Sequence, residues 1–172
     1  MSLSQIVPTD FFEIPDGPAG TRQTLKYMRE EVRKDVGNTW LREITQQIVR
    51  DVAPKDWWGE MCAIFYFVKE HVRYGLDPNG IELVQAPHVT MMLGYGDCDD
   101  LTCLISCMCE QLGHATMLCA LGFDADENYS HVLPLCIAAG SESDPIALDA
   151  TEEWPPGWFP PNDTYRMIAP IR

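Results

Sequence analysis

The residues best suited to chemistry surround one cysteine, Cys98, in the stretch GYGDCDDLTCLIS at positions 94–106. Two glycines precede it and an apolar run follows, which predicts that Cys98 lies in the first turn of a helix. Free N–H groups and the helix macrodipole at that position lower the pKa of a thiol, and the N–H of Cys98 could bind a developing oxyanion. The carboxylates of Asp97, Asp99 and Asp100 oppose the first effect, because nearby negative charge disfavours a thiolate. Cys98 is therefore either a nucleophile or a core cysteine of a helix capped by Asp97.

A nucleophilic thiol requires a base. The chain contains four histidines: His71, His88, His114 and His131. His131 differs from the others because it opens an expected strand in NYSHVLPL. Asp149 ends the next expected strand, in the apolar run IALDAT, where an unpaired buried carboxylate is costly. Cys98, His131 and Asp149 together make a set of nucleophile, base and orienting carboxylate.

The elements that must position these residues follow from the apolar periodicity. Helices are predicted from Thr21, over 39–51, from Pro54 to Gly75, and from about Cys98 to Leu112, with Gly113 at the C′ position. The segment 76–96 is expected to be a loop. Short apolar runs predict strands over 115–123, 130–139 and 145–151, followed by an extended tail with five prolines after position 154. Helices first and strands last indicate an α+β fold.

The length of 172 residues is typical of one domain. We expect a single domain over 1–172, with an N-terminal surface arm at 1–19, a helical part at 20–75, a catalytic core at 97–151 and a Pro- and aromatic-rich tail at 152–172. No internal repeat is found.

Composition narrows the class of protein. The formal net charge of −14 argues against nucleic acid and against anionic membrane surfaces as partners. No apolar run has the length of a membrane-spanning helix, and the first residues lack the pattern of a signal peptide. Seven cysteines, four of them within 98–109, make a poor disulfide framework and favour a reducing compartment, so we expect the cytoplasm. The oligomeric state is not predicted.

The order of three motifs resembles the transglutaminase-like superfamily: GDCDD before an apolar helix, SHV at a strand start and LDAT at a strand end. The stretch FVKEHVRYGLDPNGIELVQAPHVTMMLGYGDCDDLTCLI is similar to the phage and prophage branch of that group. The similarity runs from about 24 to 157. It implies a papain-like core without a cofactor, in which the cysteine helix packs on an antiparallel sheet, and a host-cell cytoplasmic location if the gene lies in a prophage. It also places the nucleophile on Cys98, the histidine on His131 and the aspartate on Asp149.

The sequence departs from the family pattern in two places. Ala150 stands where a proline is common. The second oxyanion donor has no secure match, and Gln85 is the first candidate because it carries an amide in the loop leading to Cys98. Trp57 and Trp58 are the other candidates.

The resemblance and the residue set together predict acyl transfer, in which a thiolate attacks a peptide or carboxamide carbonyl and forms a thioester. A small single domain favours hydrolysis, by a protease or deamidase, over amine transfer by a transglutaminase. The partner is expected to be a protein or peptide substrate of basic or neutral charge, such as a structural protein of a phage particle or a host protein.

Three alternatives stay open. A zinc site could use cysteines of the apolar helix and the histidine after it, although the paired short spacing of structural zinc sites is missing: Cys103, Cys107, Cys109 and His114. The domain could also be a catalytically silent scaffold or binding module. The acidic segment 124–128 lacks the oxygen spacing of an EF-hand and is expected to be a solvated turn. No metal and no cofactor are predicted.

Overall fold

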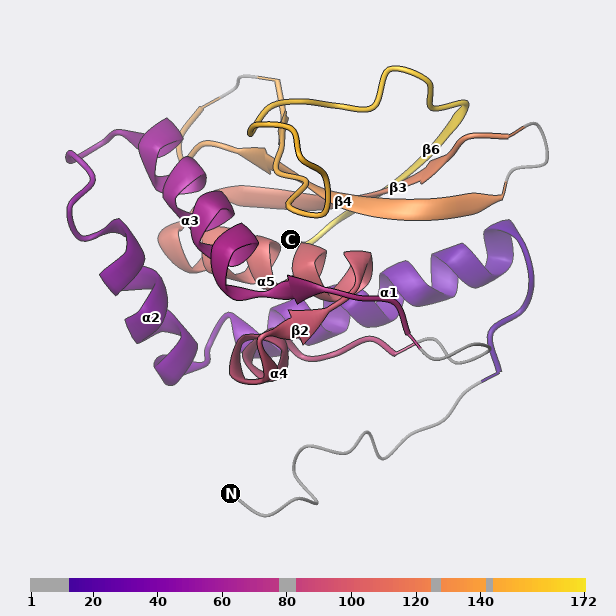
Figure 1. Cartoon of the computed structure of the whole chain (residues 1–172), viewed down its shortest axis with the longest axis horizontal. Helices are drawn as coiled ribbons and strands as arrows, with labels where there is room; N and C mark the ends of the chain where they lie inside the picture. Colours follow the sequence, from indigo (N-terminus) through magenta and orange to yellow (C-terminus); the bar gives the residue numbers. More distant parts are fainter. Residues whose placement is uncertain (1–12, 78–82, 125–127, 142–143) are drawn as a thin grey trace, which may run out of the picture.

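A four-stranded antiparallel sheet with strand order β5-β4-β3-β6 carries the helices on one of its faces (Figure 1). The computed structural model describes residues 13–77, 83–124, 128–141 and 144–172. The helices in these residues are α1 (Pro18–Asp35), α2 (Thr39–Val49), α3 (Trp57–His71), α4 (Pro87–Leu93) and α5 (Cys98–Leu112). The strands are β1 (Arg73–Tyr74), β2 (Tyr95–Gly96), β3 (Ala115–Gly122), β4 (Tyr129–Ile137), β5 (Ile146–Ala147) and β6 (Tyr165–Pro170). The predicted α+β class is confirmed.

Helix α5 is the centre of the molecule and lies directly against β3 and β4 (Figure 1). Its N-terminus is closed by a capping box, in which the side chain of Asp97 accepts from the N–H groups of Asp99 and Asp100 while Asp100 accepts from the N–H of Asp97. Its C-terminus is closed by Gly113, at φ 94°. The predicted bounds, the cap and the C′ glycine are confirmed, because apolar pattern and end signals agree along this segment.

The sheet differs from the expectation at its two edges. The strands predicted over 115–123 and 130–139 are confirmed as β3 and β4, which form a hairpin with His131 opposite Leu121. The strand predicted over 145–151 is only the two residues of β5. The tail that was predicted to be extended contains a further strand: Tyr165–Pro170 pairs with β3 at the edge of the sheet. Its alternating half-buried and exposed residues are the pattern of an edge strand, which the surrounding prolines obscured.

The first helices begin and end at other residues than predicted. Helix α1 begins at Pro18 after the N-cap Gly17, at φ 68°, and not at Thr21, because proline suits the first helical position. Helix α3 begins at Trp57, since Asp56 caps it by accepting from Gly59 N at 2.9 Å. It ends at His71, four residues before Gly75, the predicted end.

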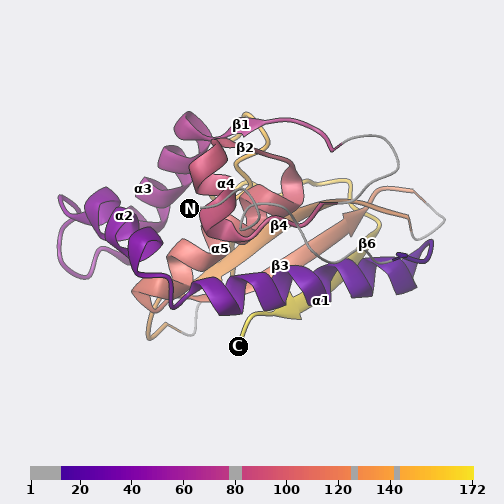
Figure 2. The same cartoon turned by 90° about the horizontal axis from the view of Figure 1, so that it is seen from below.

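The segment expected to be a loop contains two short elements in its described part. Helix α4 has proline at its start and ends at Gly94, which is left-handed at φ 60°. Strand β2 follows and pairs in parallel with β1, with Arg73 opposite Tyr95. Seven helical residues and two strand residues are too few to produce a periodic signal. Figure 2 shows β1 and β2 side by side next to α4 and α5.

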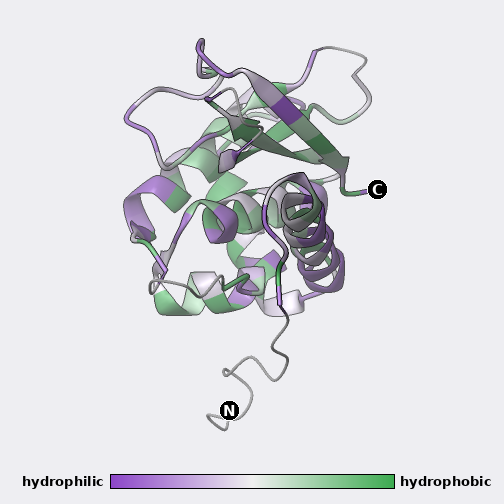
Figure 3. Ribbon diagram, turned by 90° about the vertical axis from the view of Figure 1, so that its right-hand side faces the viewer, coloured by the Kyte–Doolittle hydropathy of each residue, from purple (hydrophilic) through white to green (hydrophobic). Residues whose placement is uncertain are grey.

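The main core lies between the helices and the sheet, and the most apolar ribbon is concentrated there (Figure 3). A second, smaller cluster covers the opposite face of the sheet: Cys119, Leu121, Leu133, Leu135 and Ala147, with Met117 and Phe159 packed on it. Among the described residues, no helix has the length and apolar character needed to cross a membrane.

Candidate active site

Two hydrogen bonds to one residue of β4 fix the start of α5 on the sheet. The N–H of Val132 donates to the Cys98 thiol sulfur. The hydroxyl of Thr102, one helical turn later, donates to the carbonyl oxygen of Val132 at 3.1 Å. Residues four apart lie on one face of a helix, so both contacts come from the same side of α5. Cys98 therefore lies beside the residue that follows His131.

His131 and Asp149 form a hydrogen-bonded pair. The distance from His131 Nε2 to Asp149 Oδ2 is 2.7 Å, and the two side chains are 15% and 3% exposed. The other carboxylate oxygen, Oδ1, accepts from Thr151 Oγ1 at 2.6 Å and from Thr151 N at 3.1 Å. With Nε2 turned toward Asp149, Nδ1 is the ring nitrogen that is left for a thiol proton.

The Asp149 carboxyl is held ionised. Burial raises its pKa, but the hydrogen bond and charge of His131 and the two bonds from Thr151 outweigh burial, and the net pKa lies below the ordinary value. A carboxylate of this kind fixes the tautomer and orientation of the imidazole and stabilises its protonated form. Sequence reasoning did not identify Thr151, although a threonine two residues after an aspartate is a common local partner.

The Cys98 thiol is protonated in the resting protein. Burial raises its pKa far above the ordinary value, the charges of Asp99 and Asp97 raise it further, and only the Val132 N–H lowers it. The Cys98 sulfur lies 3.6 Å from Asp99 Oδ1. Of the two opposing effects expected at this position, the raising effect of the adjacent carboxylates is therefore present, and burial adds to it.

Gln85 does not present its amide to the thiol. Its Nε2 donates to Asp100 Oδ2 at 2.6 Å and to the carbonyl of Tyr95 at 3.5 Å, and its backbone N donates to Asp100 Oδ1 at 2.8 Å. Gln85 instead ties the loop before α4 to the start of α5 through Asp100. Asp100 is fully buried, and burial raises its pKa to about 7 despite these hydrogen bonds.

The tryptophans considered as oxyanion donors lie on the first turn of α3, and both are exposed. The ring of Trp58 packs near Gly157, in the segment that follows Asp149. No contact of Trp57 or Trp58 with Cys98 is found among the described residues.

The remaining histidines serve other parts of the fold. His88 Nδ1 lies 2.7 Å from Asp35 Oδ2 and joins α4 to the end of α1. His114 is fully buried and accepts from Ala139 N at 3.1 Å, and burial lowers its pKa. His71 stacks on Phe67 of its own helix.

The cysteines suggested as zinc ligands are part of the core of α5. Cys103 lies against the carbonyl of Met28, and Cys109 is hydrogen-bonded to Cys136 on β4. In the part of the chain that the structure describes, the one group of three possible metal ligands is Asp97, Cys98 and Asp99, whose ligand atoms lie within 4.8 Å of one another. The acidic segment 124–128 falls largely outside the described residues.

Comparison with known proteins adds information on the fold. No protein family model matches this sequence, and no curated protein does either. Among solved structures, the chain is similar to one described as a "putative protease" from Parabacteroides distasonis, with a TM-score of 0.55 and 12% sequence identity. The match covers 83% of this chain but only 35% of that one, so the present chain spans about a third of its neighbour's length. At this identity the likeness shows that the two share a fold.

Proposed function

We propose that this protein is a cysteine-dependent acyl-transfer enzyme that attacks a peptide or carboxamide carbonyl through a thioester. Cys98 is the nucleophile, His131 the general base and acid, and Asp149 the carboxylate that orients the imidazole. The observation that carries the proposal is the 2.7 Å bond between His131 and Asp149, next to a helix-start cysteine held by the neighbouring Val132 N–H. The fold is proposed to be the papain-like core implied by the resemblance to the transglutaminase-like superfamily, and the protease neighbour is consistent with it.

The reaction begins with transfer of the thiol proton to His131. Because the thiol is protonated at rest, His131 Nδ1 removes its proton as the sulfur attacks, and Asp149 stabilises the imidazolium that results. The new C–S bond forms as the carbonyl π electrons move to oxygen. When the tetrahedral intermediate collapses, the C–N bond breaks and His131 returns the proton to the leaving amine. A water molecule then repeats the sequence on the thioester.

We propose hydrolysis rather than amine transfer because part of the His131 side chain and part of Cys98 stay in contact with solvent. The side chain of His131 is 15% exposed and Cys98 is only partly buried. Water therefore competes with any amine for the thioester. Protease and deamidase differ only in whether the amide that is cleaved belongs to the backbone or to a side chain.

A second candidate function is a catalytically silent scaffold or binding module. The observation that favours it is the high pKa of Cys98, which removes the pre-formed thiolate of many cysteine enzymes. In this case the pair of His131 and Asp149 serves only to hold β4 and the segment after β5 together. The partner in either case is proposed to be a protein or peptide.

The test uses 4-nitrophenyl acetate, an activated ester that needs no specific binding, with unmodified casein as a protein substrate. We expect a burst of nitrophenolate and an acetyl group on Cys98 by mass spectrometry, both lost in Cys98→Ala and reduced in His131→Ala. The products formed from casein then separate the three activities. New amino groups indicate a protease, released ammonia indicates a deamidase, and incorporation of a dansylated amine indicates a transglutaminase.

Cys62→Ala is the matched control, since Cys62 is also partly buried but lies on α3. An acetyl group spread over Cys62 and Cys98 alike, or a rate on Cys98 that is independent of His131, contradicts the enzyme and favours the scaffold.

A further inference from the structure

We propose that the phenol of Tyr74 donates a hydrogen bond to the oxyanion of the tetrahedral intermediate, together with the backbone N–H of Cys98. The inference rests on the proposed function, because an oxyanion forms only if Cys98 attacks a carbonyl. Tyr74 would supply the second oxyanion donor, which neither Gln85 nor the tryptophans Trp57 and Trp58 provide.

The first argument is the position of Tyr74 in the fold. Tyr74 pairs with Gly96, which stands two residues before Cys98, and the N–H of Gly75 donates to the carbonyl of Gly96 at 3.0 Å. The strand pair is locked by close packing, because a Cβ atom on Gly75 would meet the Tyr95 ring at 2.3 Å. Figure 2 shows β1 and β2 next to α5. Because Tyr74 pairs with Gly96, it lies near the start of that helix.

The second argument is what surrounds the phenol. Burial raises the pKa of Tyr74, and the nearby acidic groups of Cys98, Asp97, Asp149 and Asp99 raise it further. These residues come from the start of α5 and from the segment after β5, so the phenol lies within electrostatic range of both. A phenol in such a negative environment stays protonated and remains a donor.

The third argument is access. Tyr74 is 45% exposed, and no hydrogen bond of its hydroxyl is found among the described residues. The phenolic hydroxyl of Tyr95, its neighbour on β2, is by contrast bonded to the carbonyl of Leu76 at 3.1 Å. Tyr74 is therefore the tyrosine at this site whose donor is available to a substrate.

The other donor follows from the helix geometry. Cys98 is the first residue of α5, where the backbone N–H has no partner within the helix. The side chain of Asp97 accepts from Asp99 N and Asp100 N, which leaves the N–H of Cys98 for the oxyanion. Backbone N–H groups and tyrosine hydroxyls are both among the donors that form oxyanion holes.

The step is balanced without any added reactant. As the Cys98 sulfur bonds to the carbonyl carbon, the π electron pair moves to oxygen and His131 accepts the thiol proton. The phenol and the Cys98 N–H donate hydrogen bonds to that oxygen and both keep their protons. The carbonyl re-forms when the leaving group departs.

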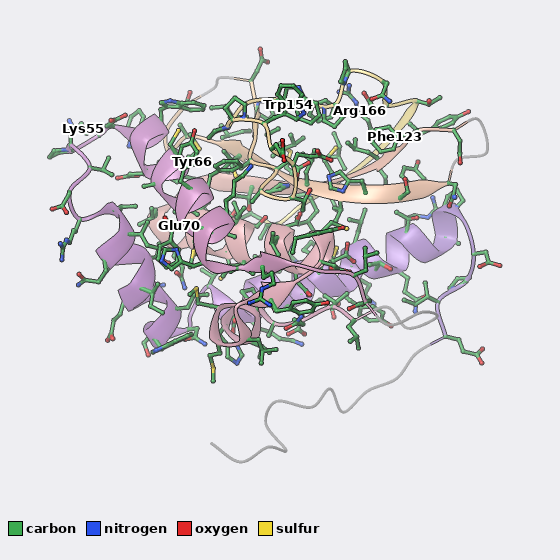
Figure 4. The ribbon with its side chains drawn as sticks, viewed as in Figure 1. Lys55, Tyr66, Glu70, Phe123, Trp154 and Arg166 are labelled. Carbon is green, nitrogen blue, oxygen red and sulfur yellow. The ribbon has the colours of Figure 1, made fainter. Side chains whose placement is uncertain are left out.

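The experiment compares two modifications of Cys98 that differ in one respect. Acylation by 4-nitrophenyl acetate passes through an oxyanion, whereas alkylation by iodoacetamide displaces iodide at a saturated carbon and forms none. We expect Tyr74→Phe to lower the acylation rate by about 100-fold or more, as for other side-chain donors. We expect its alkylation rate to change less than about twofold, because a neutral phenol leaves the local charge unchanged. Tyr66→Phe is the control, since Tyr66 is an exposed tyrosine on α3 (Figure 4).

The outcomes separate the two proposals. Acylation that depends on His131 but is unchanged in Tyr74→Phe overturns the role of Tyr74 and leaves the enzyme intact. Equal losses of acylation and alkylation in Tyr74→Phe assign a structural role to the ring and also overturn the inference. No acylation of Cys98 in the unmodified protein, with normal alkylation, overturns the enzyme and the oxyanion donor together.

Discussion

The Thr102 hydroxyl donates a hydrogen bond to the carbonyl of Val132 at 3.1 Å, and the same residue of β4 donates its N–H to the Cys98 sulfur. Cys98 and Thr102, one turn apart on α5, therefore bind the backbone N–H and the carbonyl of the same strand residue, Val132. The consequence is a fixed register between helix and strand, which sets where His131 lies relative to Cys98. Thr102 is 2% exposed, so water does not compete for this bond.

Replacing Thr102 by valine tests this register. Valine keeps the shape of the side chain but leaves the Val132 carbonyl without its helix partner, which costs about 1–3 kcal/mol of unfolding free energy. We also expect the rate of Cys98 acylation by 4-nitrophenyl acetate to fall by about tenfold, because the distance from nucleophile to base is no longer fixed. Urea unfolding and the acylation assay measure the two effects.

Thr102→Ser is the control for this substitution, since it retains the hydroxyl. If serine lowers the acylation rate as much as valine does, although it retains the hydroxyl, the hydrogen bond is not what positions the site.

The role of Asp149 predicts a dependence of stability on pH. Its folded pKa lies below the ordinary value, so the carboxylate contributes stability above about pH 4 that is lost as the pH falls through the folded pKa. Asp149→Asn should therefore be less stable than the unmodified protein at pH 7, with a difference that shrinks at pH 3. The variant should also acylate Cys98 more slowly, by up to about 10⁴-fold, because the imidazole loses its orienting charge.

Urea unfolding at the two pH values gives the comparison, with Asp51→Asn as a surface control on an exposed side chain. A stability difference that is constant from pH 7 to pH 3 would show that charge on Asp149 is not the source of its effect.

Several parts of this site could be predicted from the sequence. Cys98 at the start of a helix, Asp97 as its cap and Gly113 at its end all follow from local signals, and the structure confirms these three positions. The pairing of His131 with Asp149 was expected from the cost of a buried carboxylate, and a 2.7 Å bond between them is present. These inferences depend on short-range patterns or on one residue type in an apolar run.

Other parts depend on distant segments and could not be predicted. The partner of Gln85 is Asp100, fifteen residues away, and nothing in the loop sequence indicates that its amide faces a buried carboxylate. The edge strand β6 pairs with β3 across more than forty residues. The pKa of Cys98 depends on the depth of burial, which a first-turn position alone does not give.

The raised pKa of Cys98 predicts that a neighbouring carboxylate controls its reactivity. Burial is the largest cause and Asp99 the second, so Asp99→Asn should lower the pKa of the thiol while leaving it buried. Because each unit of pKa changes the thiolate fraction about tenfold at a pH below the pKa, we expect iodoacetamide to alkylate Cys98 several-fold faster in this variant at pH 8. Mass spectrometry of each cysteine measures the rate.

Asp51→Asn again serves as the charge-matched control, since it removes one negative charge far from the site. An equal acceleration in both variants would attribute the effect to net charge, and a slower rate in Asp99→Asn would contradict the assignment of Asp99 as a group that disfavours the thiolate.

Asp100 predicts the opposite pH dependence to Asp149. Its folded pKa is about 7, above the ordinary value, so the folded state binds a proton that the unfolded state releases between about pH 4 and pH 7. Stability contributed by the protonated acid is complete below the unfolded pKa and is lost as the pH rises through 7, by about 3–4 kcal/mol for a fully buried group. The amide side chain of the variant Asp100→Asn cannot titrate. The unfolding free energy of this variant should therefore fall less between pH 4.5 and pH 7.5 than that of the unmodified protein.

Urea unfolding of the unmodified protein and of Asp100→Asn is measured at pH 4.5 and pH 7.5. The quantity compared is the change in unfolding free energy between the two pH values in each protein. The absolute stability of the variant also changes, because Gln85 and Asp97 lose a carboxylate partner, but that loss enters equally at both pH values. Glu43→Gln, at an exposed carboxyl on α2, controls for the titration of surface groups. If the variant and the unmodified protein lose the same stability between the two pH values, Asp100 is ionised throughout. Its three hydrogen bonds from Gln85 and Asp97 then outweigh its burial.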